Sequence, residues 1–285
     1  MFLHFTTIGK FKKYFENDTK GRKEFFEQWV DAKTGRLILA KQGKKVLLID
    51  ADPQGDLTTC MGYYNQDELQ NTIGTLMSDS ICDNEIKVEE SILHHKENVD
   101  LIPANLDLSA IEFSLVNAMS REFTLKNSIR NIKDNYDYIL IDCMPSLGMM
   151  TINALTCADS VIVPTQADFL STKGLNLLFR SIANLRKSLN PKLRIDGILL
   201  TMVDSRTNFA KAIITALRES IGMNIRVFDT QIPHSVRAAE CPLEGKSIFA
   251  HDKRGKVAAA YEALTKEVTE LAQRSKHRSR TDGVR

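Results

Sequence analysis

The clearest pattern in the chain is a series of short apolar runs separated by longer segments with helical spacing. Each run has three or four residues, is rich in branched side chains, and is bounded by charged or turn residues, which is typical of buried parallel strands. These runs cover residues 46–49, 99–102, 138–141, 161–163 and 198–200.

Between and after these runs, apolar residues recur with the period of an amphipathic helix. Strands that alternate with helices predict right-handed crossovers and a parallel sheet covered on both faces. We therefore expect an α/β fold with a doubly wound, mostly parallel sheet, whose ligands bind at the carboxyl ends of the strands. The predicted helices cover residues 106–133, 172–189, 208–221 and 256–274.

Composition narrows the class of protein. Of the 285 residues, 43% are hydrophobic and 26% charged, the balance of a globular protein. The net charge of +2 is too small to indicate a nucleic-acid partner by itself. The five cysteines show no Cys-x-x-Cys spacing, so neither a zinc site nor a disulfide framework is predicted. Without an apolar run of membrane length or a signal-peptide pattern, we expect a cytoplasmic protein with no membrane contact.

The two ends of the chain differ from the middle. Residues 1–38 contain six of the thirteen phenylalanines and the single tryptophan, with lysines interleaved. This atypical N-terminal segment could be an amphipathic helical appendage, a partner-binding arm, or a segment without a selected role. Residues 39–274 form the predicted α/β domain, and residues 275–285 are a basic polar tail expected to be disordered.

Acidic residues follow two of the predicted strands. The first strand is followed by Asp-Ala-Asp-Pro-Gln-Gly, in which Asp50 and Asp52 lie two residues apart. On an extended segment this spacing directs both side chains to one side, so both can face a single pocket. Pro53 and Gly55 then predict a sharp turn.

The strand at 138–141 ends in Asp142, followed by Cys-Met-Pro-Ser-Leu-Gly. A strand-end aspartate alone is more often a loop or helix cap. The combination of the two acidic motifs is much more specific, because helix N-termini and backbone amides bind phosphate at this edge of a sheet.

On these two motifs the chain resembles the ParA/Soj family of DNA-partition ATPases, part of the deviant P-loop group that includes MinD. The resemblance runs from about residue 40 to about residue 270 and keeps its order through Thr-Ile-Asn-Ala-Leu at 151–155, Gly-Ile-Leu-Leu-Thr-Met-Val-Asp at 197–204 and Ile-Pro-His-Ser-Val-Arg-Ala-Ala-Glu at 232–240.

The resemblance implies ATP and Mg²⁺ as cofactors and a role for each acid. Asp52 matches the carboxylate that orients the attacking water, and Asp50 matches the acid beside it, near Mg²⁺. Asp142 matches the strand-end acid that holds Mg²⁺ through water.

It also implies partners: a second copy of the chain in a homodimer, non-specific DNA, and a ParB-like adaptor protein. Ile232 and Pro233 match the loop beside the adenine, and Arg237 matches a basic position implicated in DNA binding. The alternative for Arg237 is an exposed arginine paired with Glu240.

The chain departs from the family where the phosphate-binding loop belongs. Family members have Lys-Gly-Gly-x-Gly-Lys-Thr-Thr there, whereas residues 22–29 read Arg-Lys-Glu-Phe-Phe-Glu-Gln-Trp. Glycines allow consecutive amides to face the phosphates, whereas glutamates repel a triphosphate. No Gly-x-x-x-x-Gly-Lys occurs elsewhere in the sequence. Residues 2–8 are expected to replace the family's first strand.

Two functional hypotheses follow. One is a working partition ATPase, and the other is a degenerate, non-hydrolysing relative that binds DNA or a partner but not nucleotide. Enzymatic activity stays open between them. A MinD-like membrane positioner is disfavoured because the chain ends polar, and an iron–sulfur relative is disfavoured because no cysteine pair has a suitable context.

Overall fold

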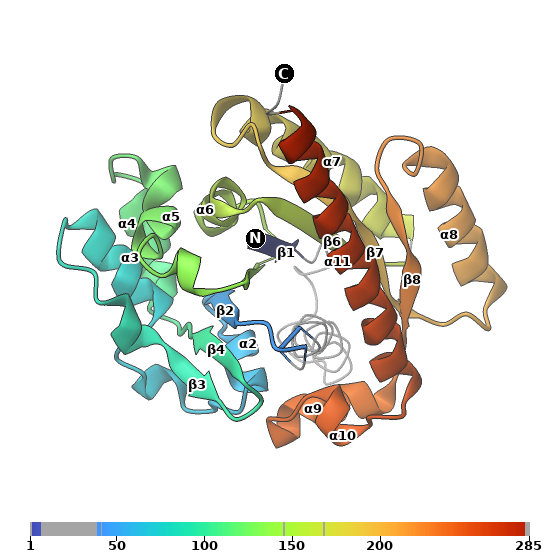
Figure 1. Cartoon of the computed structure of the whole chain (residues 1–285), viewed down its shortest axis with the longest axis horizontal. Coiled ribbons are helices and arrows are strands. Elements are labelled where there is room, and N and C mark those ends of the chain that lie inside the picture. The colour runs from blue at the N-terminus through green and yellow to red at the C-terminus, as the bar shows by residue number, and fades with distance from the viewer. Residues whose placement is uncertain (1, 7–38, 41, 145, 168, 283–285) are drawn as a thin grey trace.

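A single eight-stranded sheet organises the molecule, with strand order β3-β4-β2-β5-β1-β6-β7-β8 (Figure 1). The computed structural model describes residues 2–6, 39–40, 42–144, 146–167 and 169–282. Every strand pair is parallel except β3–β4, so the predicted doubly wound, mostly parallel fold is confirmed.

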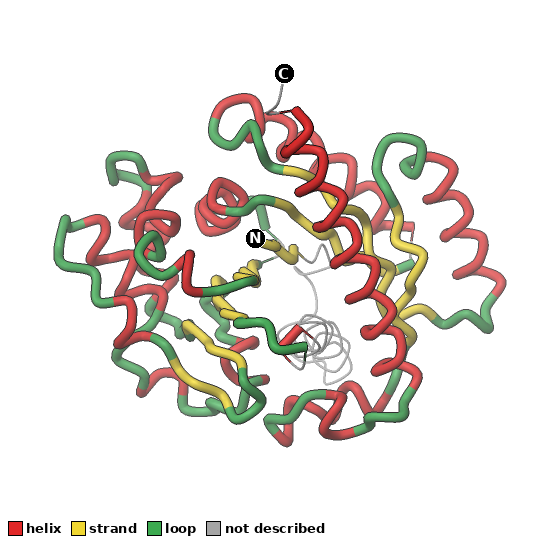
Figure 2. Tube along the Cα trace, in the orientation of Figure 1, coloured by secondary structure: helices red, strands yellow, loops and turns green. Residues whose placement is uncertain are grey.

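The strands include all five that the apolar runs predicted. Figure 2 shows them in yellow among the helices in red. Their bounds are β1 Phe2–Thr6, β2 Val46–Ala51, β3 Leu93–His95, β4 Val99–Ile102, β5 Tyr138–Cys143, β6 Ser160–Gln166, β7 Arg194–Val203 and β8 Val227–Pro233.

Within the described chain no helix is both long and apolar enough to cross a membrane. The described helices lie on both faces of the sheet (Figure 1). Their bounds are α2 Asp56–Cys60, α3 Ile73–Ile81, α4 Leu108–Leu115, α5 Thr124–Ser128, α6 Met149–Cys157, α7 Phe169–Ser188, α8 Asn208–Ser220, α9 Val236–Glu244, α10 Ile248–His251 and α11 Lys256–Asp282.

Strand β1 takes the central place expected for residues 2–8, and the structure confirms this expectation for Phe2–Thr6. It pairs in parallel with β5 on one side and β6 on the other. Its last residue, Thr6, is the register partner of Cys143, the last residue of β5. The remainder of the atypical N-terminal segment, residues 7–38, lies outside the described residues.

Alternate residues of the strands supply separate parts of the hydrophobic core. On β2, Leu48 packs with residues of α11 such as Tyr261, whereas Leu47 and Ile49 pack with α3–α6. A third cluster joins the β6–β7 part of the sheet to α7 and α8. Because β2 is buried on both faces, its near-continuous apolar run is the sequence signal of a central parallel strand.

Two helix predictions need correction. The single helix predicted at 106–133 is wrong: the chain forms α4 and α5, with a left-handed residue, Ser120 at φ 52°, between them. The disorder expected after residue 274 is also wrong up to residue 282, because α11 continues to Asp282. Lysine and arginine are good helix formers, so a polar, basic composition does not by itself end a helix.

Glu267 of α11 fastens this long helix to the edge strand β8. Its carboxylate accepts hydrogen bonds from the backbone N–H of Thr230 at 2.8 Å and of Asp229 at 3.2 Å. The Thr230 hydroxyl and the Arg226 guanidinium also donate to it, the latter at 3.0 Å. Although burial opposes this, the hydrogen bonds hold the pKa of Glu267 below its ordinary value.

We predict that Glu267→Ala lowers the free energy of unfolding by about 2–3 kcal/mol, because two strand N–H groups lose their acceptor. The lowered pKa means that the contribution is present above the unfolded pKa of about 4.5 and is lost as the pH falls through the folded value. Urea unfolding at neutral and acidic pH measures both effects. Glu262→Ala, an exposed position on the same helix, is the matched control, and equal losses from both variants would contradict the prediction.

Candidate functional site

The predicted acids meet at the carboxyl edge of the sheet. Asp50 of β2 and Asp142 of β5 are direct register partners. Residues in register on parallel strands project from the same face, and neighbouring strands lie about 5 Å apart. Both acids are buried. The structure therefore brings together two side chains that lie far apart in the sequence, as the strand-end motifs predicted.

Hydrogen bonds to α2 hold Asp50 in place. Its Oδ2 accepts from the Thr58 backbone N–H at 2.8 Å and from the Thr58 hydroxyl at 2.7 Å. The same hydroxyl accepts from the Ala104 N–H at 3.1 Å, which ties the end of β4 to the site. The Asp52 N–H donates to Asp50 Oδ1 at 3.3 Å. Asp50 thus shapes the turn after β2.

Asp52 lies in that turn and is buried. Its Oδ1 accepts from the Gln54 N–H at 2.9 Å. Burial raises the pKa of Asp52 to about 7, with further contributions from the negative charges of Asp50 and Glu112. A carboxyl group with such a pKa can exchange protons near neutral pH, as general acid–base chemistry requires.

Gly55 makes the turn possible. Its φ of +63° lies in the left-handed region, and a Cβ atom there would lie 2.9 Å from the Ala104 carbonyl oxygen. The Gly55 N–H donates to the Asp52 carbonyl at 2.9 Å. The glycine therefore brings α2, and Thr58 with it, back towards Asp50.

Asp56 is a site residue that the sequence interpretation missed. It is the first residue of α2, and burial raises its pKa to about 8, with further contributions from Asp52, Asp50 and Asp142. Its Oδ2 is buried without a hydrogen-bond partner in the described part of the chain. The available signal was a third aspartate six residues after Asp50, on the turn that the sequence had predicted.

Glu112 was also missed. It extends from α4, and its Oε1 accepts the Met150 N–H at 3.2 Å in the first turn of α6. A Cβ atom at Gly148 would lie 2.9 Å from this oxygen, so the carboxylate occupies the space that the glycine leaves. Glu112 thereby supports the loop that follows Asp142 and adds negative charge near Asp52. No local motif in the sequence indicates this contact.

The other predicted site residues lie at the same edge of the sheet but further along it. Ile232 and Pro233 end β8, which β1, β6 and β7 separate from β5. Ile232 is buried in the core, whereas Pro233 is partly exposed. The side chain of Ile232 is thus directed into the protein interior.

Arg237 is the second residue of the helix α9 that follows β8. Its side chain is 66% exposed and forms an ion pair with Asp252, at 3.4 Å between Nη1 and Oδ1. The alternative of a pair with Glu240 is wrong, because Glu240 contacts His251 at 3.2 Å instead. An exposed guanidinium with a single surface partner remains accessible to a polyanion.

The acidic edge suits Mg²⁺ in its donor atoms. Mg²⁺ is usually bound by one or two carboxylates together with water and phosphate oxygens. Within the described residues, no group of three or more His, Cys, Asp or Glu side chains is arranged to hold a metal alone. The unpartnered Asp56 oxygen and the raised pKa values of Asp52 and Asp56 fit a site where nearby positive charge would stabilise the acids.

We predict that Asp56→Asn stabilises the protein at about pH 8 and has little effect at about pH 4. The folded pKa of Asp56, about 8, lies above its ordinary 3.8, so the folded state keeps a proton that the unfolded state loses. Stability therefore falls as the pH rises from about 4 to about 8. Because one pKa unit corresponds to about 1.4 kcal/mol, removing this ionisation should contribute several kcal/mol at the higher pH, with an upper bound of about 5–6 kcal/mol.

Thermal unfolding across this pH range provides the measurement. Asp67→Asn changes an exposed aspartate and is the matched control. An Asp56→Asn variant whose gain in stability does not depend on pH would contradict the interpretation of the buried acid.

Comparison with known proteins identifies the fold family. The sequence profile of an AAA domain family matches residues 36–195. The sporulation initiation inhibitor protein Soj of Bacillus subtilis is 42% identical over 230 residues, which cover 81% of this chain and 88% of Soj. The chromosome partitioning protein ParA of Myxococcus xanthus is 39% identical over 232 residues, covering 81% of this chain and 79% of ParA.

A solved structure agrees with this assignment. The cobyrinic acid a,c-diamide synthase structure from Mycobacterium smegmatis, with bound ATP analogue and magnesium, superposes with a TM-score of 0.76 at 26% identity. The alignment covers 93% of this chain and 92% of that one. From the extent and identity of these matches, the chain belongs to the ParA/Soj family of partition ATPases, within the P-loop NTPases.

Proposed function

We propose that the protein acts in the partitioning of plasmid, chromosome or mobile-element DNA as a ParA/Soj-like ATPase. In this proposal ATP drives formation of a homodimer, the dimer binds DNA without sequence preference, and a ParB-like adaptor triggers hydrolysis and release. The observation that carries the proposal is the register pair Asp50–Asp142 beside Asp52.

Each acid has a part in this proposal. Asp142 and Asp50 would hold Mg²⁺, which neutralises phosphate charge when it is bound. Asp52, buried and with a pKa near 7, would orient the attacking water. The Mycobacterium smegmatis structure with an ATP analogue and magnesium supports these ligands at the level of the fold family.

The proposal places the nucleobase and the DNA further along the edge. Pro233 and the neighbouring backbone would contact the adenine, with the buried Ile232 supporting them from the core. Arg237 would contact DNA phosphates through its exposed guanidinium. When Arg237 binds a DNA phosphate in place of Asp252, its guanidinium still has a negatively charged partner.

A second candidate function is favoured by the sequence of residues 7–38, which has no Gly-x-x-x-x-Gly-Lys. Loss of the phosphate-binding backbone and its lysine removes charge-assisted hydrogen bonds of about 1.5–3 kcal/mol each. A loss of about 5 kcal/mol corresponds to more than a thousandfold weaker binding. In this form the protein would bind DNA or a partner independently of nucleotide.

The ATPase proposal predicts saturable binding of a fluorescent ATP analogue in the presence of Mg²⁺. Asp52→Ala should retain this binding and abolish phosphate release, because the water loses its orienting group while the phosphates keep their contacts. Fluorescence titration and a phosphate-release assay measure the two steps. Absence of Mg²⁺-dependent binding in the unmodified chain would exclude the ATPase and favour the second candidate.

For DNA binding, Arg237→Ala should weaken affinity for unrelated duplex sequences to a similar degree. Loss of one phosphate contact should also reduce the slope of log affinity against log salt by about one. Fluorescence anisotropy at several salt concentrations measures both. Arg130→Ala, at an exposed position before β5, is the control, and an unchanged salt slope in the Arg237 variant would remove Arg237 from the DNA interface.

A further inference from the structure

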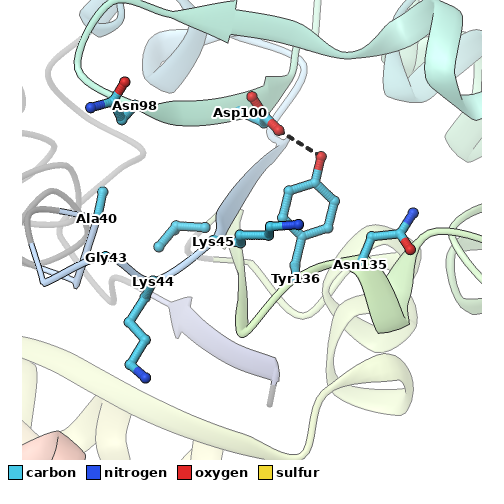
Figure 3. A pocket seen from close by; sticks show the side chains of 9 residues that line it. Ala40, Gly43, Lys44, Lys45, Asn98, Asp100, Asn135 and Tyr136 are labelled. Carbon is cyan, nitrogen blue, oxygen red and sulfur yellow. Dashed lines mark hydrogen bonds between the residues drawn. The ribbon is translucent and has the colours of Figure 1, made fainter.

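A cavity of about 580 Å³ opens at the opposite edge of the sheet from the acids (Figure 3). It lies at the amino ends of β2, β4 and β5, where Val46, Asp100 and Tyr136 contribute to its lining. Val46 and Asp50 are four residues apart on β2, which places the cavity and the acidic edge about 13 Å apart. The cavity is therefore separate from the proposed nucleotide site.

Most hydrogen-bonding side chains around the cavity are donors that make no hydrogen bond within the described chain. Lys44, Lys45, Asn98 and Asn135 line the cavity, and Figure 3 shows the Lys45 ammonium beside the Tyr136 ring. Within the described chain, none of these four side chains makes a hydrogen bond or an ion pair. Lysine has only donors, and an asparagine amide has two. Two positively charged side chains and several unused N–H groups thus belong to the residues around the cavity.

Among the described residues that line the cavity, the single carboxylate is already engaged. Asp100 accepts from the Tyr136 hydroxyl at 2.7 Å and contacts Nδ1 of His94 at 2.6 Å. Burial raises the pKa of Tyr136, and its hydrogen bond to Asp100 raises it further, so the phenol stays a donor at neutral pH. With both oxygens of Asp100 occupied, the described lining leaves no carboxylate oxygen free for a cation.

The backbone around the lysines is fixed. The Lys45 N–H donates to Oδ2 of Asp137 at 2.9 Å, and the Lys45 carbonyl accepts from the Asp137 and Tyr138 N–H groups. On the other side, the Lys44 N–H donates to the Leu39 carbonyl at 3.1 Å across a turn. With the backbone fixed in this way, only the two lysine side chains have to be ordered when a ligand binds.

Asn98 is held in a similar way. It has a positive φ of 58° in the turn between β3 and β4, and its N–H donates to the His95 carbonyl at 3.0 Å. Asparagine tolerates this left-handed conformation better than most residues. Asn98 therefore belongs to a second, independently fixed segment of the cavity wall.

We propose that this cavity binds a small anion that carries phosphate or carboxylate groups, with the Tyr136 ring as an apolar wall for the body of the ligand. The volume lies within the range of small-molecule sites. Two lysines and two asparagines line it, and the one carboxylate among the described lining residues already accepts two contacts. This site is independent of nucleotide binding at the acidic edge.

Calorimetric titration of the full chain with pyrophosphate and with citrate, without Mg²⁺, tests the proposal. We expect saturable binding of at least one of them that weakens as salt is added. The double variant Lys44→Gln/Lys45→Gln should lose affinity by at least about tenfold, since two charge-assisted contacts are removed. Lys187→Gln/Lys192→Gln, at exposed positions of the α7–β7 region, removes the same charge elsewhere and should bind like the unmodified chain.

Asn135→Asp provides a second, nearly isosteric test that does not touch the lysines. Its added negative charge should also weaken binding by about tenfold, without affecting the backbone of Lys44 and Lys45 before β2. In NMR spectra, the side-chain amides of Asn98 and Asn135 should shift on titration, whereas the backbone amide of Thr58 at the acidic edge should not.

Three results would overturn the proposal. One is the absence of saturable binding of both probes up to about 10 mM, the range of very weak association. Another is binding that neither the lysine variant nor Asn135→Asp weakens. The third is binding of duplex DNA, but not of the small anions, that depends on Lys44 and Lys45, which would assign this surface to DNA.

Discussion

Burial of negative charge at the carboxyl edge of the sheet is the constraint on which the site depends. Asp50, Asp52 and Asp142 are nearly inaccessible to solvent, and Asp56 is buried enough for its pKa to rise to about 8. Charged carboxylates lose much of their hydration there, so they require donors, protons or a cation. Thr58 and the turn amides supply donors to Asp50 and Asp52. Asp56 instead retains its proton, so its carboxyl group stays neutral and avoids the cost of a buried charge.

The central strand shows why the fold can form although the phosphate loop is missing from the sequence. Strand β1 pairs with β5 and β6 through backbone groups, which many sequences can provide. A phosphate cradle instead requires glycines, because only they allow consecutive amides to approach an anion closely. The family's architecture is therefore far more tolerant of a changed N-terminal sequence than its nucleotide chemistry is.

Much of this architecture was predictable because it rests on local patterns. The apolar runs specify five strands, and the strand-end aspartates specify the acidic edge once the sheet is parallel. The break between α4 and α5 was not predictable from periodicity, since apolar residues keep helical spacing across Ser120, whose left-handed backbone ends the continuity. Glu112 and the Arg237–Asp252 pair depend on tertiary contacts between distant segments. Local sequence carries no signal for such contacts.

The two edges of the sheet differ in the charge that they favour. Lys44 and Lys45 lead into β2 at one end, and Asp50 and Asp52 leave it at the other. The separation of about 13 Å exceeds the Debye length of about 8 Å at physiological salt. Direct electrostatic coupling between an anion at the amino edge and the acids would therefore be largely screened where the path is exposed. Any stronger coupling would have to pass through displacement of β2, which is buried along its whole length and densely packed on both faces. A strand confined in this way resists small displacements, so the proposed anion cavity and the acidic edge should bind their ligands almost independently.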